Sequence, residues 1–232
     1  AFEGGAIRCG MRAADGAIEV ITLDPTASED ADAVTLGVIG DVEPRGLCGS
    51  GLVDAVSELV RVGLLDASGR FVPEEDAARD VPRLADRLTT VGQGERVFVL
   101  HRPTPDAPVA ESVYLSQRDV RELQFAKAAI STGWTLLLEE LGVTARDVQQ
   151  VLLAGSFGSY LSPASAVRIG LVPKLPVLRI VSAGNVAGEG AKMVLLSARE
   201  RAGAEALLRE VAYVELSDRP DFNDRFIDQL GF

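Results

Sequence analysis

The sequence has few residues that could hold a transition metal. It contains two cysteines, Cys9 and Cys48, and one histidine, His101, among 232 residues. A zinc site or an iron–sulfur cluster needs three or four such ligands close together. We therefore expect no metal centre built by this chain alone. The two thiols are interpreted as small buried residues, and His101 as a structural or exposed side chain.

Positive charge and long apolar runs are also scarce. The 23 Lys and Arg residues are outnumbered by 34 Asp and Glu residues, which gives a formal net charge of −11. Most of this surface would repel a nucleic-acid backbone. No apolar run approaches the roughly 20 residues of a membrane span, and no basic-then-apolar signal segment is present. We expect a cytoplasmic globular protein without nucleic-acid or membrane partners.

The hydrophobic content of 47% is enough for one sizeable core. The sequence opens with Ala1 to Gly5, a glycine-containing segment without an initiator methionine. Such glycines are typical of a functional turn inside a domain rather than of a frayed end. We therefore expect the chain to be a truncated part of a larger domain.

Local patterns predict the elements of the first half. Short runs rich in β-branched residues indicate two hairpins, with strands at residues 17–23, 36–42, 96–100 and 112–115. Residues 52–62 have helical apolar spacing and follow the turn Gly49-Ser50-Gly51. Residues 66–94 are polar, and we expect loops there with one short helix near 82–88.

The clearest helical pattern covers residues 117–141. Ser116 and Asp119 have the spacing of a capping box at its start. Its apolar stripe contains Val120, Leu123, Ile130, Trp134, Leu137 and Leu141. Lys127 lies on the same stripe. Its stem could pack while its ammonium group reaches water, or it could contact a ligand.

The second half repeats a unit of strand, glycine turn and helix. In the first copy, a buried strand at 150–154 leads into Gly155-Ser156-Phe157-Gly158 and then a short helix. In the second, a strand at 177–181 leads into a turn and a helix at 186–199. This repetition predicts a parallel or mixed α/β sheet with a ligand beyond the carboxyl ends of its strands.

The last segment is expected to contain a helix at 202–211, a strand at 213–216 and an amphipathic tail that packs on the core. The glycine turns could let backbone amides approach a phosphate. Neither the P-loop spacing nor the GxGxxG spacing is present, and no catalytic triad can be assembled. Each turn taken alone is weak evidence for a nucleotide.

Several blocks of the sequence carry a resemblance that covers nearly the whole chain. In order, they are Ala1 to Ile7, Gly10 to Ala13, Gly16 to Glu19, Gly46 to Leu52, Gln117 to Ile130, Leu153 to Gly158, Ile169 to Pro173 and Gly184 to Ala191. They resemble blocks of the reductive activators of corrinoid proteins, in the same order. The resemblance implies an α/β fold of the actin-like ATPase (ASKHA, ribonuclease H-like) kind, in which a mixed sheet is flanked by helices and two lobes close on ATP. Residues 1–232 would form the C-terminal part of that domain.

The family implies an activity that this chain would share with missing segments. Family members use ATP hydrolysis to drive the one-electron reduction of cob(II)alamin to cob(I)alamin in a corrinoid protein. The electron comes through an N-terminal domain with a 2Fe–2S cluster. That domain and both phosphate loops have no counterpart in this sequence. The implied cofactors are ATP and Mg²⁺, the implied partner is a corrinoid protein of a methyltransferase system, and homodimer formation is left open.

The resemblance also implies binding residues. The turn Gly155, Ser156, Phe157, Gly158 would contact the adenosine, and Gln117, Arg121 and Lys127 would flank the adenine. The turn Gly49, Ser50, Gly51 would line the opposite wall, and Glu3 would approach the terminal phosphate and its Mg²⁺ as the catalytic residue. No metal-binding residue is assigned.

Two other functions stay open. A sugar or carboxylate kinase of the same superfamily would transfer phosphate to a small acceptor, although no acceptor-binding signature is visible. A non-catalytic module that docks onto a corrinoid protein would bind its partner without nucleotide.

Overall fold

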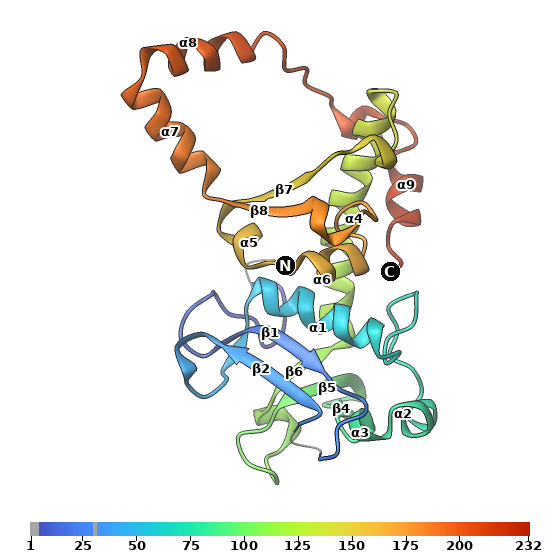
Figure 1. Cartoon of the computed structure of the whole chain (residues 1–232). Coiled ribbons are helices and arrows are strands. Elements are labelled where there is room, and N and C mark those ends of the chain that lie inside the picture. Colours follow the sequence, from blue (N-terminus) through green and yellow to red (C-terminus); the bar gives the residue numbers. More distant parts are fainter. Residues whose placement is uncertain (1–4, 30–31) are drawn as a thin grey trace.

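Figure 1 shows the computed structural model, which describes residues 5–29 and 32–232. The strands are β1 (Ala17–Leu23), β2 (Val34–Val38), β3 (Gly46–Leu47), β4 (Leu88–Val91), β5 (Glu95–His101), β6 (Val113–Ser116), β7 (Val151–Ala154) and β8 (Ile180–Gly184). The α-helices are α1 (Gly49–Arg61), α2 (Glu74–Asp80), α3 (Pro82–Ala85), α4 (Gln117–Glu140), α5 (Gly155–Tyr160), α6 (Pro163–Arg168), α7 (Val186–Leu196), α8 (Ala198–Leu207) and α9 (Phe222–Asp228).

The described strands form three small sheets. β1 pairs with β2 in the antiparallel sense and with β3 in the parallel sense. β5 lies between β4 and β6, both antiparallel to it. β7 and β8 form a parallel pair joined through α5 and α6. The two predicted hairpins and the predicted strand–helix–strand unit are therefore confirmed, and the mixed α/β class is correct.

Helix α1 lies at the centre of the core. Its apolar residues Leu52, Val53, Val56 and Leu59 are fully buried. It packs on β1 and on α6, between the lower sheets and the β7–β8 pair in Figure 1. The helix ends at Arg61 and is followed by Val62 and then by Gly63, whose φ of 80° lies in the left-handed region that favours glycine. The same core includes side chains from β1, β5, α4 and α6.

Helix α4 begins as its sequence predicts. The Ser116 hydroxyl accepts from the Asp119 amide, and the Asp119 carboxylate accepts from the Ser116 amide, which forms the capping box. Asp119 also accepts from the amide of Arg8 at 2.8 Å, so the cap ties the first described segment to α4. The predicted stripe is only partly buried, because Ile130, Leu137 and Leu141 are exposed.

After α8, the chain returns to α4 through α9. The Phe226 ring of α9 stacks on Phe125 with ring centroids 6.0 Å apart. The Gln124 side-chain amide donates to the Leu230 carbonyl at 2.7 Å, and the Phe232 amide donates to the Ala67 carbonyl at 2.9 Å. The prediction that the tail packs back on the core is confirmed.

Several predicted boundaries were wrong. Residues 39–41 form a 3₁₀ turn rather than the end of a strand, and α2 and β4 occupy a region predicted mainly as loop. The second buried strand is shifted, since β8 begins at Ile180 and includes the turn predicted at 182–185. Residues 213–216 are not a strand, and the last helices divide at Ser197, whose hydroxyl accepts from the Glu200 amide and caps α8.

Candidate functional site

One cavity brings together residues from both predicted glycine-turn regions. It has a volume of about 830 Å³. It is lined by Met11, Arg12, Ala13, Glu19, Ile39, Cys48, Gly49, Ser50, Phe157 and Tyr160. Its wall therefore comes from the loop before β1, from β1 itself, from the 3₁₀ turn after β2, from the start of α1 and from α5.

The first turn of α1 is held against β1 by the absence of a side chain. A Cβ atom on Gly51 would lie 2.1 Å from the Ile18 carbonyl oxygen, so only glycine fits there. Cys48 precedes the helix, and no side chain caps the first-turn amides. Such amides carry partial positive charge and are suited to an anion. The predicted residues Gly49 and Ser50 line the cavity, whereas Gly51 positions the helix.

The turn after β7 presents Phe157 to the same cavity. Gly155 has a φ of 88°, which allows the chain to turn sharply from β7 into α5. A Cβ atom on Gly158 would lie 2.8 Å from the Leu153 carbonyl carbon, so Gly158 permits close packing of α5 on β7. Nothing lies within 4 Å of a Cβ atom at Gly155. Ser156 belongs to α5, and its side chain lies outside the described atoms.

The predicted face of α4 does not reach this cavity. The Gln117 side-chain amide donates to the Gly69 carbonyl at 2.6 Å, and Arg121 donates to the Ser68 carbonyl at 2.7 Å. Lys127 is 2% exposed and donates to the Gly231 carbonyl. These side chains hold the loop between α1 and α2 and the C-terminal tail. Their contact with adenine stays a prediction.

The buried Lys127 corrects one sequence interpretation. Its ammonium group does not reach water, and its nitrogen lies 5.5 Å from the centre of the Phe232 ring. Burial, together with the charge of Lys174, lowers the pKa of Lys127 to about 8. Helical spacing placed the lysine on the buried stripe, but the tail residues that cover it could not be inferred from that spacing.

Other predicted residues have different outcomes. Glu3 lies outside the described residues. His101 Nε2 lies 2.7 Å from Glu43 Oε1, which fits a structural role. Cys48 is buried and Cys9 is partly buried, as the interpretation of small packed residues requires.

Three polar or aromatic residues of the cavity were missed from sequence. Arg12, Glu19 and Tyr160 all line it. Arg12 and Glu19 are within segments that carried the family resemblance, but neither has a motif spacing of its own. Tyr160 is two residues beyond Gly158, and extending the glycine turn by half a helical turn would have found it.

The described residues contain neither a cluster of metal ligands nor a helix that could span a membrane. Residues 5–29 and 32–232 contain no group of three or more His, Cys, Asp and Glu side chains arranged to hold a metal ion. No helix in these ranges has the length and apolar character needed to cross a membrane.

Comparison with known proteins identifies the domain. The model of the C-terminal domain of RACo, the ASKHA domain, matches residues 1–232. The chain belongs to this family. The predicted resemblance and the ASKHA fold class are therefore confirmed.

Relatives and one solved structure agree with this assignment. The corrinoid activation enzyme RamQ of Eubacterium limosum is 35% identical over 232 residues, which cover 100% of this chain and 38% of RamQ. The reductase of the Co(II) methylated amine-specific corrinoid protein from Methanosarcina barkeri is 22% identical over 251 residues, covering 100% of this chain and 40% of that protein. A solved reductive activator for corrinoid, iron–sulfur protein superposes with a TM-score of 0.80 at 32% identity, covering 100% of this chain and 35% of the other. The chain thus spans two fifths or less of each of these proteins.

Proposed function

We propose that this chain forms one wall of the nucleotide site in an ATP-dependent reductive activator of corrinoid proteins. One observation carries the proposal: Gly49 and Ser50 at the start of α1 line the same cavity as Phe157 on α5. These residues come from two turns that the family resemblance assigns to opposite walls of a nucleotide cleft.

The cavity has the size and chemistry that a nucleotide requires. Its volume of about 830 Å³ is within the range of about 300–1,000 Å³ for small-molecule sites. The uncapped amides of α1 and the guanidinium group of Arg12 suit phosphate groups. Met11, Ile39 and Phe157 offer apolar surface to a base or ribose. Glu19 supplies a carboxylate, the type of ligand that Mg²⁺ prefers.

We further propose that residues beyond the matched region complete the site in the longer protein. β7 and β8 are parallel, and parallel sheets are normally covered on both faces. Leu152 on β7 is nevertheless 59% exposed. Additional strands and the phosphate loops would cover this surface and close on ATP.

In that longer protein, ATP hydrolysis would drive one electron from a 2Fe–2S cluster to Co(II), giving Co(I). The reduced cofactor belongs to a corrinoid protein of a methyltransferase system, which would be the binding partner. A cytoplasmic location and a homodimer are parts of the same proposal. The names of the relatives, which describe corrinoid activation and reduction, support it.

Calorimetric titration with Mg-ATP and Mg-ADP tests the nucleotide site. We expect binding by a longer protein that contains this chain, and weaker binding by the chain itself. Tyr160→Ala and Arg12→Gln should each weaken nucleotide binding by about tenfold, equivalent to about 1.4 kcal/mol. The matched controls are Tyr213→Ala and Arg209→Gln, because both side chains are exposed and neither lines the cavity.

The same titration can reject the proposal. Absence of nucleotide binding by both proteins would eliminate an ATPase role and favour the non-catalytic docking module, which should then bind a corrinoid protein without ATP. If both proteins bind but the Tyr160 and Arg12 variants bind normally, the nucleotide occupies a different cavity.

A further inference from the structure

A second cavity lies beside the candidate nucleotide site. It has a volume of about 400 Å³ and is bounded by β1, by α1 and by residues 159–168. Tyr160 lines both cavities, so its side chain marks the boundary between them.

A buried polar stripe on α1 connects the two cavities. Ser50, Asp54 and Glu58 are spaced four residues apart and therefore share one face of the helix. Their exposed fractions are 5%, 6% and 9%. Ser50 lines the first cavity, and the two carboxylates line the second. Polar groups on the buried face of a core helix need hydrogen-bond partners. The partners of each carboxylate therefore determine whether it is free to bind a ligand in the cavity.

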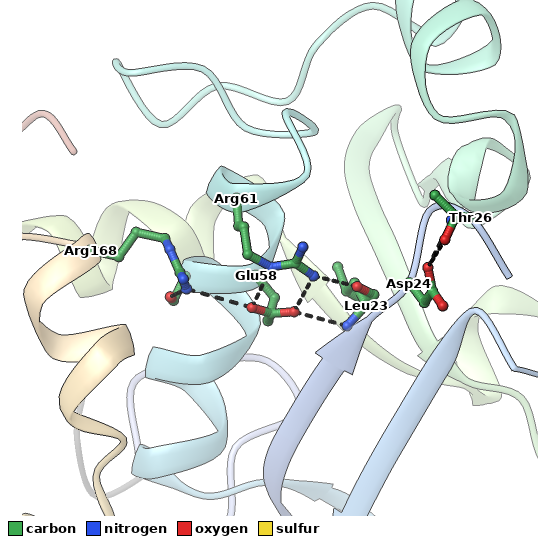
Figure 2. A network of polar contacts seen from close by, with 7 residues as sticks. Leu23, Asp24, Thr26, Glu58, Arg61 and Arg168 are labelled. Atoms are coloured by element: carbon green, nitrogen blue, oxygen red, sulfur yellow. Dashed lines mark hydrogen bonds and ion pairs between the residues drawn. The ribbon is translucent and has the colours of Figure 1, made fainter. Parts of the chain in front are cut away.

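The Glu58 carboxylate is fully compensated. It accepts from the Leu23 amide at 2.9 Å and from Arg61 Nε at 2.8 Å, and Arg168 lies 3.5 Å away (Figure 2). Burial raises the pKa of Glu58, but the hydrogen bonds from Arg61 and Leu23 and the charges of both arginines outweigh it and lower the pKa overall. Glu58 thus has its own positive partners and offers no net charge to the cavity.

The Asp54 carboxylate is less completely partnered. Its Oδ1 atom is buried and has no hydrogen-bond partner among the described residues. Burial raises the pKa of Asp54 and outweighs the opposing effects of the Ser165 hydroxyl, the Ile21 amide and the charge of Arg168. Arg168, the only positively charged residue lining the cavity in the described chain, donates to Ser57 at 2.6 Å and pairs with Glu58. One carboxylate oxygen is therefore left without a partner beside a cavity lined by hydroxyl groups.

We propose that this cavity binds a monovalent metal cation, Na⁺ or K⁺, with the Asp54 carboxylate as its charged ligand. The unpartnered oxygen requires either a hydrogen-bond donor or a cation. The surrounding groups include Thr22, Ser159, Ser162 and Ser165, whose hydroxyl oxygens suit a hard cation. Asp54 offers a single carboxylate, which suits a singly charged cation, whereas Ca²⁺ and Mg²⁺ sites normally use further carboxylates. Glu58, already paired with two arginines, is not available as a second.

The bound cation would join three parts of the fold. Asp54 is on α1, Thr22 is on β1, and Ser165 is on α6. A cation held between them stabilises the folded chain in proportion to its occupancy, because the unfolded chain does not assemble the site. This binding does not depend on nucleotide, so it can be tested separately from the proposed function.

Thermal unfolding of the full chain at constant ionic strength tests the proposal. The salts to compare are NaCl, KCl and tetramethylammonium chloride, whose cation is too large for oxygen coordination by Asp54. At a cation concentration of about 100 times Kd, Na⁺ or K⁺ should raise Tm by about 5 °C over tetramethylammonium. Asp54→Asn should abolish the rise, whereas Asp106→Asn, at an exposed turn, should keep it.

A second variant and a direct probe cover the case in which Asp54→Asn does not fold. Ser165→Ala keeps the carboxylate and removes one neutral ligand, so the rise should persist but require several-fold more cation. Tl⁺, a K⁺ substitute, should give a bound ²⁰⁵Tl NMR signal that K⁺ or Na⁺ displaces. Equal Tm values in all three salts, a rise retained by Asp54→Asn, or stabilisation by Mg²⁺ alone would each overturn the proposal.

Discussion

Helices α1 and α7 both follow short strands and lie in opposite environments. Each is separated from its strand by a single residue, Cys48 or Asn185, and each carries a run of apolar residues. In α1, every residue from Gly49 to Leu59 is buried. In α7, no residue is buried, and Leu195 and Leu196 are 75% and 83% exposed. In Figure 1, α7 and α8 project from the β7–β8 pair, away from the core.

The formation of these helices and their burial have different causes. The Asn185 side chain accepts from the Gly188 amide at 3.0 Å, so α7 has the side-chain cap that α1 lacks. Local capping therefore accounts for where α7 begins. Burial depends on neighbouring elements, and α1 has β1 and α6 against it while α7 contacts mainly α8. The exposed apolar face of α7 is consistent with the proposed covering by a longer protein.

The largest expected difference between the two helices comes from their glycines. Gly51→Ala places a methyl group against the Ile18 carbonyl and should lower the free energy of unfolding by at least about 4 kcal/mol. Gly190 in α7 has open space around it, so Gly190→Ala should not destabilise the chain and could add up to about 1 kcal/mol through helix propensity. Urea unfolding of both variants measures this. Similar losses in the two variants would contradict the distinction.

Leucine truncation should give the next largest difference. Leu59 is fully buried in α1, and Leu59→Ala should cost about 3 kcal/mol through lost burial and a residual cavity. Leu196→Ala in α7 should change stability by less than about 0.5 kcal/mol. Denaturant unfolding of the chain gives both values. A cost above about 1 kcal/mol at Leu196 would mean that α7 is covered in solution, for instance by a second copy.

The sequence predicts local structure better than it predicts coverage. The capping box at Ser116, the β1–β2 hairpin and the helix after Gly51 depend on neighbouring residues in the sequence, and all three were predicted. The strand at 151–154 was expected to be covered on both faces because its residues are apolar, yet Leu152 is exposed. The apolar composition of a segment predicts that the segment can be buried, but it does not identify the element that covers it.

In the candidate site, too, the sequence predicts local features better than contacts between distant segments. Gly49, Ser50 and Phe157 lie in glycine turns that are visible in the sequence, the family resemblance assigned these turns to the site, and all three residues line one cavity. Arg12 reaches the cavity through the packing of separate segments, which leaves no pattern in the sequence. Lys127 was recognised as part of a buried stripe, but the tail that covers it comes from more than 100 residues later in the chain.

The smallest predicted effect concerns Lys127. This lysine contacts the C-terminal tail, which packs on the core again after the exposed helices α7 and α8, here called the α7–α8 arm. Burial lowers the pKa of Lys127 from its ordinary value of 10.5 to about 8. Between about pH 8 and 10.5, the unfolded chain therefore holds a proton that the folded chain has released. The free energy of unfolding should then rise with pH, by at most about 1.4 kcal/mol per pH unit, while below pH 8 this lysine should add no slope.

Subtracting the profile of Lys127→Met from that of the wild type isolates this contribution, because other groups titrate equally in both proteins. Lys192→Met in α7 is the matched control, since the Lys192 side chain is 62% exposed and pairs only with the neighbouring Glu189 among the described residues. Its profile should follow the wild type throughout. If Lys127→Met also follows the wild type above pH 8, the ammonium group is solvated in solution, and the C-terminal tail is then no more firmly packed than the α7–α8 arm.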